Sequence, residues 1–386
     1  MDKNKRLTVW LPVIIAASIA LGIFIGNHYL SISQGKKRSY SSGNKINAIL
    51  DIIDEQYVDT VSMSKLVEST IPKIFSELDP HSVYIPAEDA SVVNEELEGS
   101  FSGIGVSFNM QTDTILVISV ISGGPAEKAG LLPFDRIISI NDSIFSGKKK
   151  NQGEIMKTLR GAKNSTVKLG VQRGNSPELL YFDVTRGDVP VNSVDVSYEA
   201  AKGIGYIKVS KFARNTYNEF ITAIAKLKQA GCTSFVIDLR GNTGGYMDAA
   251  INMINEFMPE GRLIVYTEGK SFSRSDVYAN GTGTCKDAPI VVLTDEISAS
   301  ASEIFSGAIQ DNDRGTIIGR RTYGKGLVQT QMSLSDGSEM RLTIARYYTP
   351  SGRCIQKKYE MGNTDAYDQD IYNRYMHGEF DSADSI

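Results

Sequence analysis

The chain has 386 residues, of which 41% are apolar and 22% charged, and its formal net charge at pH 7 is −4. This length favours two or three domains of a globular protein. No basic stripe or Arg-rich run points to a nucleic-acid partner. The three cysteines and three histidines lack metal-ligand spacing, so the sequence indicates neither a metal nor a cofactor.

Residues 1–30 combine a basic start with an apolar run. From Leu7 to Gly26 the chain has 20 uncharged residues, which as a helix would span roughly 30 Å, the thickness of a bilayer's hydrocarbon core. We expect an uncleaved, single-pass transmembrane anchor in the cell inner membrane, with the bulk of the chain on the periplasmic side. The alternative is a cleaved signal peptide and a secreted protein, although Ser31–Ser33 is a poor cleavage site. Residues 31–44, rich in Ser and Gly, are typical of a flexible linker.

The next two segments differ in hydrophobic period. Residues 45–95 form an N-terminal helical segment: from Lys45 to about Asp79 apolar side chains recur at helical spacing, and the helical pattern closes at the proline-bracketed stretch "LDPHSVYIP". Residues 96–187 contain short alternating runs between Gly-rich turns, with one helical pattern among them, and predict a compact β-rich module. The expected strands of this module are "GIGVSFNM", "TILVISVI", "DRIISIND", "TVKLGVQR" and "LLYFDVTR".

Strands and helices alternate through residues 188–356. The strand patterns "GIGYIKVSKF", "SFVIDLR" and "APIVVLTD" are each followed by a helical pattern, which predicts an α/β core with a largely buried sheet. Alternation on both sides of the later turn "SDGS" predicts a β-hairpin. Residues 357–386 are acidic and Tyr-rich without any period, and we expect a loosely ordered tail.

The stretch "GRRTYGKGL" is one residue short of a phosphate-binding P-loop. Gly319, Gly324 and Lys325 fit the pattern, but Gly326 replaces the hydroxyl residue and a hairpin follows where a helix is needed. We therefore reject the nucleotide hypothesis. A lysine desolvated on a buried sheet can instead become neutral near pH 7 and act as a general base.

A serine nucleophile for such a base is available in "DEISASASEIF". There a buried strand leads into a helix that begins close to Ser300 or Ser302, so either hydroxyl would stand at the positive end of the helix dipole. Ser300 and Glu303 also form a capping box, whose ordinary role is only to start a helix. Only His81 could complete a Ser-His-Asp triad, and it lies far from the core in sequence, so lysine is the favoured base.

A glycine-rich turn, "DLRGNTGG", separates the strand "SFVIDLR" from the helix after it. Its simplest interpretation is a tight strand-to-helix turn. Beside a nucleophile, the same turn could offer backbone N–H groups to an oxyanion.

The order of these motifs resembles that of the C-terminal processing (tail-specific) serine peptidases, from the helical segment to Gln356. The resemblance implies a mixed-sheet core like those of crotonase and ClpP and a Ser/Lys dyad. Its catalytic residues would be the nucleophile Ser300, the general base Lys325 and Gln329, which orients the lysine amine. Its oxyanion donors would be the N–H groups of Ala301 and of Gly244 or Gly245, between which the sequence does not decide.

The β-rich module resembles the PDZ domain inserted in the same peptidases. "FSGIGV" matches the carboxylate-binding loop, and "GGPAEKAGLLPFDRIISIND" matches the helix and strand after it. The chain departs from the family at Phe134, where Gly is usual, and in lacking a "GxGIxPD" segment between "TPSGRCIQ" and Ile386. A substrate terminus would bind this loop and add as an extra strand. The implied peptide-binding residues are Ser102, Gly103, Ile104 and Gly105.

The sequence therefore predicts a membrane-tethered serine endopeptidase that cleaves exported proteins after recognising their unstructured C-termini through a PDZ domain. The alternative is a non-catalytic PDZ adaptor that keeps the protease fold as a peptide-binding scaffold. Homo-oligomerisation is left open by the sequence.

Overall fold

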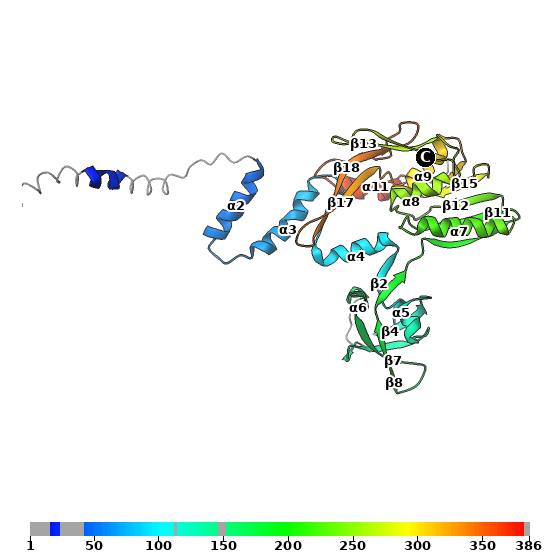
Figure 1. Ribbon diagram of the computed structural model, residues 1–386, viewed down its shortest axis with the longest axis horizontal. Helices are drawn as coiled ribbons and strands as arrows, with labels where there is room; N and C mark the ends of the chain where they lie inside the picture. Colours follow the sequence, from blue (N-terminus) through cyan, green and yellow to red (C-terminus); the bar gives the residue numbers. More distant parts are fainter. Residues whose placement is uncertain (1–15, 24–41, 112–113, 146–151, 382–386) are drawn as a thin grey trace, which may run out of the picture. The chain divides into compact units, whose positions relative to one another are not determined.

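The computed structural model describes residues 16–23, 42–111, 114–145 and 152–381 (Figure 1). The chain divides into two compact units, Met1–Thr70 and Ile71–Ile386. In the first unit, residues 16–23 are helical, and the rest of the predicted membrane span lies outside the described residues. None of the helices in the described part of the chain is long and apolar enough to cross a membrane.

The predicted helical segment contains α2 (Ser42–Gln56) and α3 (Met63–Ser76), which confirms its helical period. The proline-bracketed stretch is the short strand β1 (Val83–Ile85), as its extended pattern indicated. Helix α4 (Ala87–Glu98), which we did not predict, follows at once and ends at Gly99 in the left-handed region.

The β-rich module is an antiparallel sheet with a core of its own. Its strands run in the order β3-β4-β5-β7-β8, with β6 paired to β5, while β2 pairs with β9 apart from this sheet. Buried Val117, Ile137 and Leu169 belong to its separate hydrophobic cluster. All five predicted strands and the predicted helix are confirmed. The elements are β2 (Ser100–Gly103), β3 (Val106–Gln111), β4 (Thr114–Val120), α5 (Pro125–Ala129), β5 (Arg136–Ile140), β6 (Ser143–Ile144), α6 (Gln152–Leu159), β7 (Thr166–Gln172), β8 (Leu179–Thr185) and β9 (Gly187–Pro190).

The main core sheet is mixed, as expected for the α/β segment. Its order is β10-β11-β12-β15-β16, where β10 is antiparallel to β11 and the remaining neighbours are parallel. Helices α7, α8 and α9 pack with these strands in one hydrophobic cluster. The resemblance to crotonase and ClpP stays a prediction. The elements are β10 (Val194–Ala201), β11 (Ile204–Val209), α7 (Thr216–Gln229), β12 (Ser234–Asp238), α8 (Met247–Asn255), β15 (Ile290–Thr294), α9 (Ala301–Asp311) and β16 (Thr316–Gly319).

A second core sheet is built around the predicted hairpin. Strand β17 (Leu327–Ser333) pairs with β18 (Glu339–Tyr348), and β18 also pairs with β1 and with β13 (Leu263–Glu268), which is followed by β14 (Ser275–Tyr278). Thus β1 from the helical segment completes a sheet whose other strands lie more than 150 residues later.

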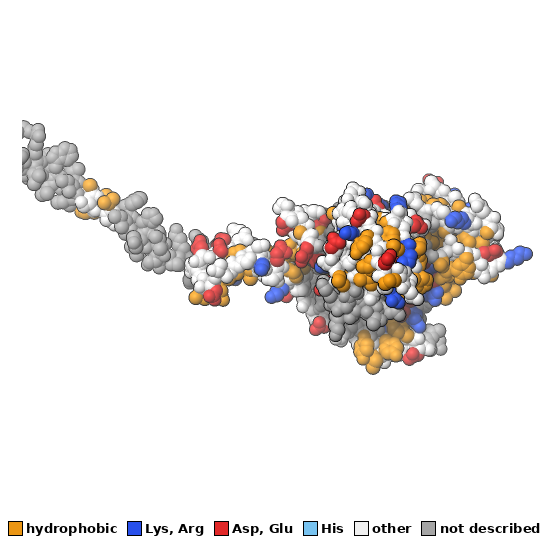
Figure 2. Space-filling view, turned by 90° about the horizontal axis from the view of Figure 1, so that it is seen from below, with side chains coloured by type: hydrophobic (Ala, Val, Ile, Leu, Met, Phe, Trp, Pro, Cys, Tyr) orange, Lys and Arg blue, Asp and Glu red, His pale blue; other side chains and the backbone are white. Residues whose placement is uncertain are grey.

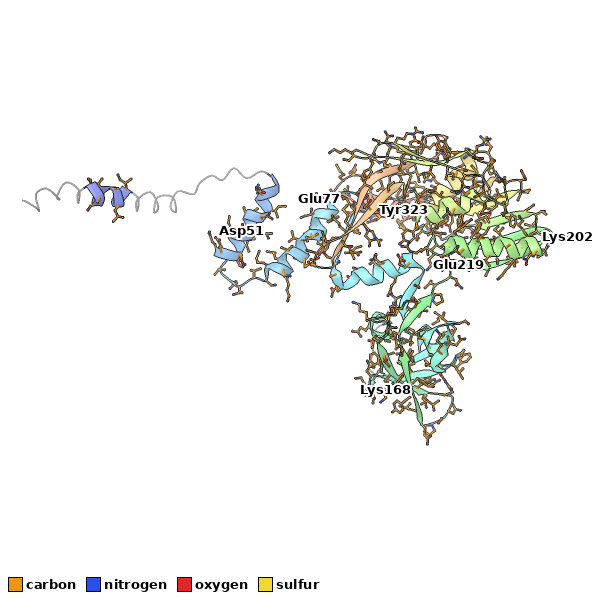
Figure 3. The ribbon with its side chains drawn as sticks, in the orientation of Figure 1. Asp51, Glu77, Lys168, Lys202, Glu219 and Tyr323 are labelled. Atoms are coloured by element: carbon orange, nitrogen blue, oxygen red, sulfur yellow. The ribbon has the colours of Figure 1, made fainter. Side chains whose placement is uncertain are left out.

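Two labelled side chains in Figure 3 distinguish the β-rich module from the core. Lys168 lies on β7 of the module, and Glu219 lies on α7 of the core. The Glu219 carboxylate accepts hydrogen bonds from the N–H groups of Ser193 and Val194, at 2.7 and 2.9 Å, and so fixes the chain where it enters the core after β9.

In the space-filling view, acidic and basic side chains are interspersed with hydrophobic ones (Figure 2).

The prediction of a loose tail is wrong for residues 357–381. They contain two short helices, α10 (Asp365–Asp368) and α11 (Asp370–Met376), with Tyr367 and Arg374 buried. The Tyr367 hydroxyl lies 2.7 Å from His81 Nε2, and Arg374 donates hydrogen bonds to the carbonyl oxygens of residues 321 and 322. Contacts with distant residues order this segment, and a local hydrophobic period does not reveal such contacts.

Phe257 provides a test of the core packing. Its fully buried ring lies 6.2 to 6.5 Å from the rings of Phe220, Phe235 and Phe305. Phe257→Ala is expected to lower the free energy of unfolding of the core by about 3–5 kcal/mol, because it removes apolar contacts and leaves a cavity. Urea unfolding measures this loss. The control Phe272→Ala, at a ring that is 48% exposed, should change it by less than about 0.5 kcal/mol.

Candidate active site

Three neighbouring parallel strands build the site. Strands β12, β15 and β16 lie side by side, so the loops that follow their carboxyl ends meet at one edge of the sheet. The first loop carries the glycine-rich turn, the second carries Ser300, and the third carries Lys325. Parallel pairing therefore brings together three motifs that are spread over more than 80 residues of sequence.

The first two loops are hydrogen-bonded to each other. The Asn242 carbonyl oxygen accepts from the Ala299 N–H at 3.0 Å and from the Ser302 hydroxyl at 2.9 Å. The Ser298 hydroxyl donates to the Leu239 carbonyl oxygen at 2.8 Å. Ser302, the alternative nucleophile, is fully buried and engaged in this link, so the geometry favours Ser300.

Ser300 lies immediately before α9 with an unusual backbone conformation. Its φ of 55° and ψ of −111° place a non-glycine residue in a strained region of backbone space. The Gly244 backbone packs closely against it, because a Cβ added to Gly244 would lie 2.7 Å from Ser300 Cβ. Glycine is therefore needed at position 244 for this approach.

Glu303 connects the serine to the lysine loop. Its buried Oε2 accepts hydrogen bonds from the N–H groups of Ser300 and Lys325, each at 2.8 Å. Its Oε1 accepts from the Thr322 hydroxyl and the Gly324 N–H, each at 2.7 Å. Burial raises the pKa of this carboxyl group, while the four donors favour its ionised form. The predicted capping box is thus one part of a larger link between two loops. We call the four hydrogen bonds of Glu303 to the Ser300 and Lys325 loops the Glu303 clip.

The Lys325 side chain is partly buried and lies near charges of both signs. Burial is the main cause that lowers its pKa, and the nearby Arg341 guanidinium lowers it further. Asp79 and Glu303 act in the opposite direction without cancelling the shift. The amine therefore loses its proton at a lower pH than an exposed lysine.

Gln329 is held by a residue that the sequence placed far away. Its side-chain nitrogen donates to the carbonyl oxygen of His81, 248 residues earlier in the chain. Burial and the Lys325 charge lower the pKa of His81 to about 4, so this imidazole is neutral at pH 7. Asp79 shapes the turn by accepting from the N–H groups of His81 and Ser82, both at 3.0 Å. The "LDPHS" motif drew attention to His81 in the sequence, but no local pattern indicated that this turn packs against Gln329.

The structure distinguishes the two glycines of the turn. The Gly244 N–H is donated to the Asn242 side chain at 2.9 Å. Within the described residues, no hydrogen bond is recorded for the N–H of Gly245 or for that of Ala301 at the start of α9. The N–H groups of Gly245 and Ala301 are thus the free donors beside Ser300.

One cavity of about 650 Å³ brings the predicted site residues together. Ser300, Lys325 and Gln329 all line it, and so do Gly244 and Gly245. No hydrogen bond joins the Ser300 hydroxyl to the Lys325 amine among these described residues. The other side chains around the cavity are mainly polar or aromatic, and they include Lys211, Tyr246, Asp248, Gln331, Arg341 and Tyr347.

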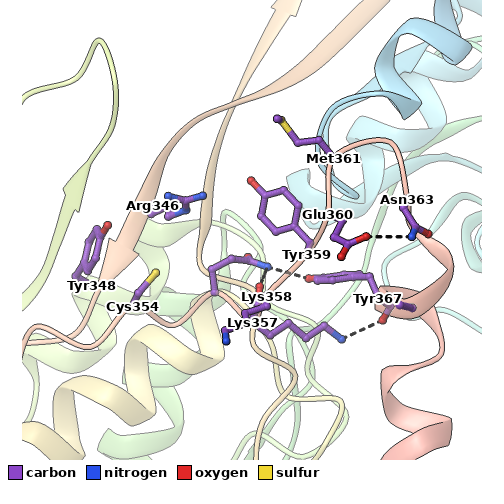
Figure 4. A pocket seen from close by; sticks show the side chains of 12 residues that line it. Arg346, Tyr348, Cys354, Lys357, Lys358, Tyr359, Glu360, Met361, Asn363 and Tyr367 are labelled. Carbon is purple, nitrogen blue, oxygen red and sulfur yellow. Dashed lines mark hydrogen bonds between the residues drawn. The ribbon is translucent and has the colours of Figure 1, made fainter.

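A second cavity, of about 860 Å³, shares no lining residue with the first (Figure 4). The tail and the end of β18 form it, and in the close-up Lys357 donates to the Tyr367 carbonyl oxygen at 3.2 Å. Throughout the described part of the chain, no group of three or more His, Cys, Asp or Glu residues is placed to hold a metal ion.

The predicted peptide-binding loop of the β-rich module is partly occupied. The Ser102 N–H donates to the Glu95 carboxylate at 3.1 Å, and Ile104 is buried. Gly105 has a φ of 79° and packs near Val189, which suits glycine. Gly103 is the last residue of β2, where it pairs with Gly187 of β9, so among the four predicted residues Ile104 and Gly105 remain for a ligand carboxylate. Phe134 adopts a φ of 70° and is 74% exposed, a conformation in which glycine would be unstrained.

Comparisons with known proteins agree with this arrangement. Residues 203–365 match the model of peptidase family S41, and residues 102–195 match that of the PDZ domain. The chain is 35% identical to the carboxy-terminal processing protease CtpB of Bacillus subtilis over 82% of its own length and 66% of that protein's. It is 33% identical to a probable CtpA-like serine protease of Staphylococcus aureus over 92% of its own length and 72% of that protein's.

A solved structure of a photosystem II D1 C-terminal processing protease is also similar, with 28% identity, a TM-score of 0.46, and coverage of 82% of this chain and 91% of that one. The identity to the CtpA-like proteins over most of both chains confirms the resemblance inferred from the motifs. The chain belongs to the C-terminal processing serine peptidases of family S41 and contains a PDZ domain.

Proposed function

We propose that the chain is a serine endopeptidase that uses a Ser300/Lys325 dyad to cleave exported proteins near their C-termini. The observation that carries the proposal is the shared cavity, which Ser300, Lys325 and Gln329 line together with the glycine-rich turn. The lowered pKa of Lys325 supports its role as a base, because only the neutral amine can accept the serine proton.

The proposed reaction is acyl transfer through an acyl-enzyme. Lys325 Nζ accepts the hydroxyl proton as Ser300 Oγ attacks the scissile carbonyl carbon. The N–H groups of Gly245 and Ala301 stabilise the resulting oxyanion. The C–N bond then breaks, the lysine ammonium returns the proton to the leaving amine, and water hydrolyses the ester by the reverse proton transfers.

Gln329 has a positioning role in this proposal. Because its side-chain nitrogen donates to the His81 carbonyl oxygen, its own oxygen is the atom left to accept a hydrogen bond from the lysine. Rotation of the Lys325 side chain within the cavity would close the distance to the serine, since catalytic hydrogen bonds of resting enzymes often form only with substrate bound.

We further propose that unstructured C-termini bind the PDZ domain through the N–H groups of Ile104 and Gly105. The PDZ family match supports peptide binding by this module. The apolar run Leu7–Gly26 supports an inner-membrane anchor, with the peptidase on the periplasmic side. Separation of cells into membrane and soluble fractions tests the anchor separately from the chemistry, because an anchored chain is recovered with the membranes.

Incubation of the full chain with an unstructured protein tests the dyad. Ser300→Ala is expected to lower kcat by about 10⁴-fold or more, because no other group replaces the attacking oxygen. Binding of a C-terminal peptide, measured by fluorescence anisotropy, should remain. Equal cleavage by wild type and Ser300→Ala would refute the proposed nucleophile. Peptide binding without any cleavage by wild type would instead favour the non-catalytic adaptor.

A further inference from the structure

Arg341 is a cation in the wall of the active-site cavity, and it has no anionic partner among the residues that the structure describes. It lies on β18, directly opposite Gln331 of β17, and both residues line the cavity that contains Ser300. Its Nε donates to Gln331 Oε1 at 3.1 Å. Its Nη2 is buried and has no hydrogen-bond partner, and no ion pair to Arg341 is recorded within the described residues.

Such an arrangement lowers the stability of the folded protein unless a hydrogen-bond acceptor binds the unpaired nitrogen. A buried guanidinium nitrogen that has lost its water and has no acceptor destabilises the protein. Besides Arg341, the lining of the cavity carries the cation Lys211 and the base Lys325 against the single acid Asp248, so positive charge is in excess there even when Lys325 is neutral. Both the unused donor and the excess of positive charge therefore favour an anionic group entering this cavity.

The position of Arg341 limits where that anion can be on a substrate. On the same hairpin, Gln329 lies opposite Thr343, and the next pair on that face is Gln331 opposite Arg341. Successive pairs on one face of a strand are roughly 7 Å apart, which corresponds to about two residues of an extended peptide. An anion bound to Arg341 would thus lie within a few residues of the bond that is cut.

We propose that Arg341 forms a carboxylate-binding subsite in the catalytic cavity and makes the enzyme select substrates with a carboxylate close to the scissile bond. A planar guanidinium suits a carboxylate because its N–H groups can meet both oxygens. The carboxylate is either an Asp or Glu side chain or the free α-carboxylate of a short remaining terminus. This inference rests on the proposed peptidase function, and it is separate from terminus recognition by the PDZ domain.

The test uses the full chain and matched peptides. In the first set, which is C-terminally amidated, a single Glu is moved along the peptide and each peptide is compared with its Gln counterpart. In the second set, all peptides are neutral in their side chains, and a free acid is compared with an amide at termini placed two to four residues after the cleaved bond. The quantity measured is the ratio of kcat/KM within each pair.

Wild type is expected to prefer one Glu position, or the free acid, by about 10- to 100-fold, which is the range for a charge-assisted hydrogen bond. Arg341→Gln should bring that ratio close to one, and Arg341→Lys should retain part of it. Because each ratio is taken within one variant, any change in the basicity of Lys325 cancels. If Arg341→Gln brings the Glu-to-Gln ratio to one, the carboxylate is a side chain. If it brings the acid-to-amide ratio to one, the carboxylate is the chain terminus.

Lys211→Gln is the matched control, because it removes another cation from the same cavity. Its ratios should equal those of wild type. The proposal is overturned if wild type shows no preference in either set, if Arg341→Gln keeps the preference, or if Lys211→Gln abolishes it equally.

Anisotropy with the same peptides separates this inference from the proposed function. On the Ser300→Ala protein, the acidic peptide should bind about 10-fold or more tightly than its neutral counterpart, and the added Arg341→Gln should remove the difference. This measurement decides the role of Arg341 even if wild type cleaves none of the peptides, an outcome that would count against the peptidase proposal alone.

Discussion

Lys325→Met is expected to lower kcat/KM by about 10⁴-fold, because it removes the base while keeping a side chain of similar length. Lys325→Arg should be equally inactive, since a guanidinium keeps its proton at any pH at which the protein is folded. Hydrolysis of an unstructured protein or a fluorogenic peptide measures both effects. Lys211→Met, at the other lysine of the cavity, is the control and should retain hydrolysis.

The pH dependence of wild type follows from the same group. Below the pKa of Lys325 the amine is protonated and inactive, so kcat/KM should rise tenfold per pH unit and level off above that pKa. Burial and the Arg341 charge lower this pKa, while Asp79 and Glu303 raise it by less, so the rise should end at a lower pH than for an ordinary lysine. Neutral His81 adds no charge near pH 7.

Two observations would contradict this account of Lys325. One is a Lys325→Met protein that hydrolyses substrate at more than about a hundredth of the wild-type rate. The other is a pH profile that is flat from pH 6 to pH 10, because the protonation of a catalytic lysine would then not limit the rate.

Glu303→Gln is expected to lower kcat by about 100-fold, although the two side chains have nearly the same shape. Each carboxylate oxygen of Glu303 accepts from two donors. Whichever way an amide is turned, its NH₂ group would face two of these donors. In either orientation the lysine loop loses hydrogen bonds to α9, so Lys325 shifts relative to Ser300, and a displacement of about 1 Å can cost 100-fold in rate. The free energy of unfolding should also fall, by about 1–3 kcal/mol.

The kinetics of this variant distinguish a positioning role from a merely structural one. We expect KM to change little while kcat falls, measured at a temperature where circular dichroism shows the variant to be folded. Glu296→Gln is the matched control and should leave kcat unchanged, because in the described part of the chain the Glu296 carboxylate pairs only with Arg320, at 3.4 Å. An unaltered kcat in Glu303→Gln would show that the clip does not position the dyad.

Several elements could be predicted because their signals are local. These signals depend on residues that are close together in sequence. They are the alternation in the β-rich module, the helical spacing between the core strands, and the turn "SDGS". The structure has strands, helices and a hairpin at these places. The P-loop hypothesis was rejected for the same kind of reason, since the residues after Lys325 have the period of a strand.

Other features depend on contacts that no local pattern contains. The tail looked unstructured, yet Tyr367 packs against His81, 286 residues earlier. Neither glycine of the turn was preferred in sequence, whereas the structure commits the Gly244 N–H to Asn242. Helix α4 and strand β10 were also missed; the side chains of β10 are almost all exposed, so it carries little periodic signal.

By itself, the sequence determined that the chain is a serine peptidase and in which order its modules follow, since motif spacing and hydrophobic period depend on the order of residues alone. Only the tertiary structure decided which atoms meet. Parallel pairing of β12, β15 and β16 gathers three loops at one sheet edge, Glu303 ties two of them together, and the β17–β18 hairpin turns Arg341 into the same cavity. The physical reason is that such contacts arise from strand pairing and burial between distant segments, whose register is fixed by packing rather than by neighbouring residues.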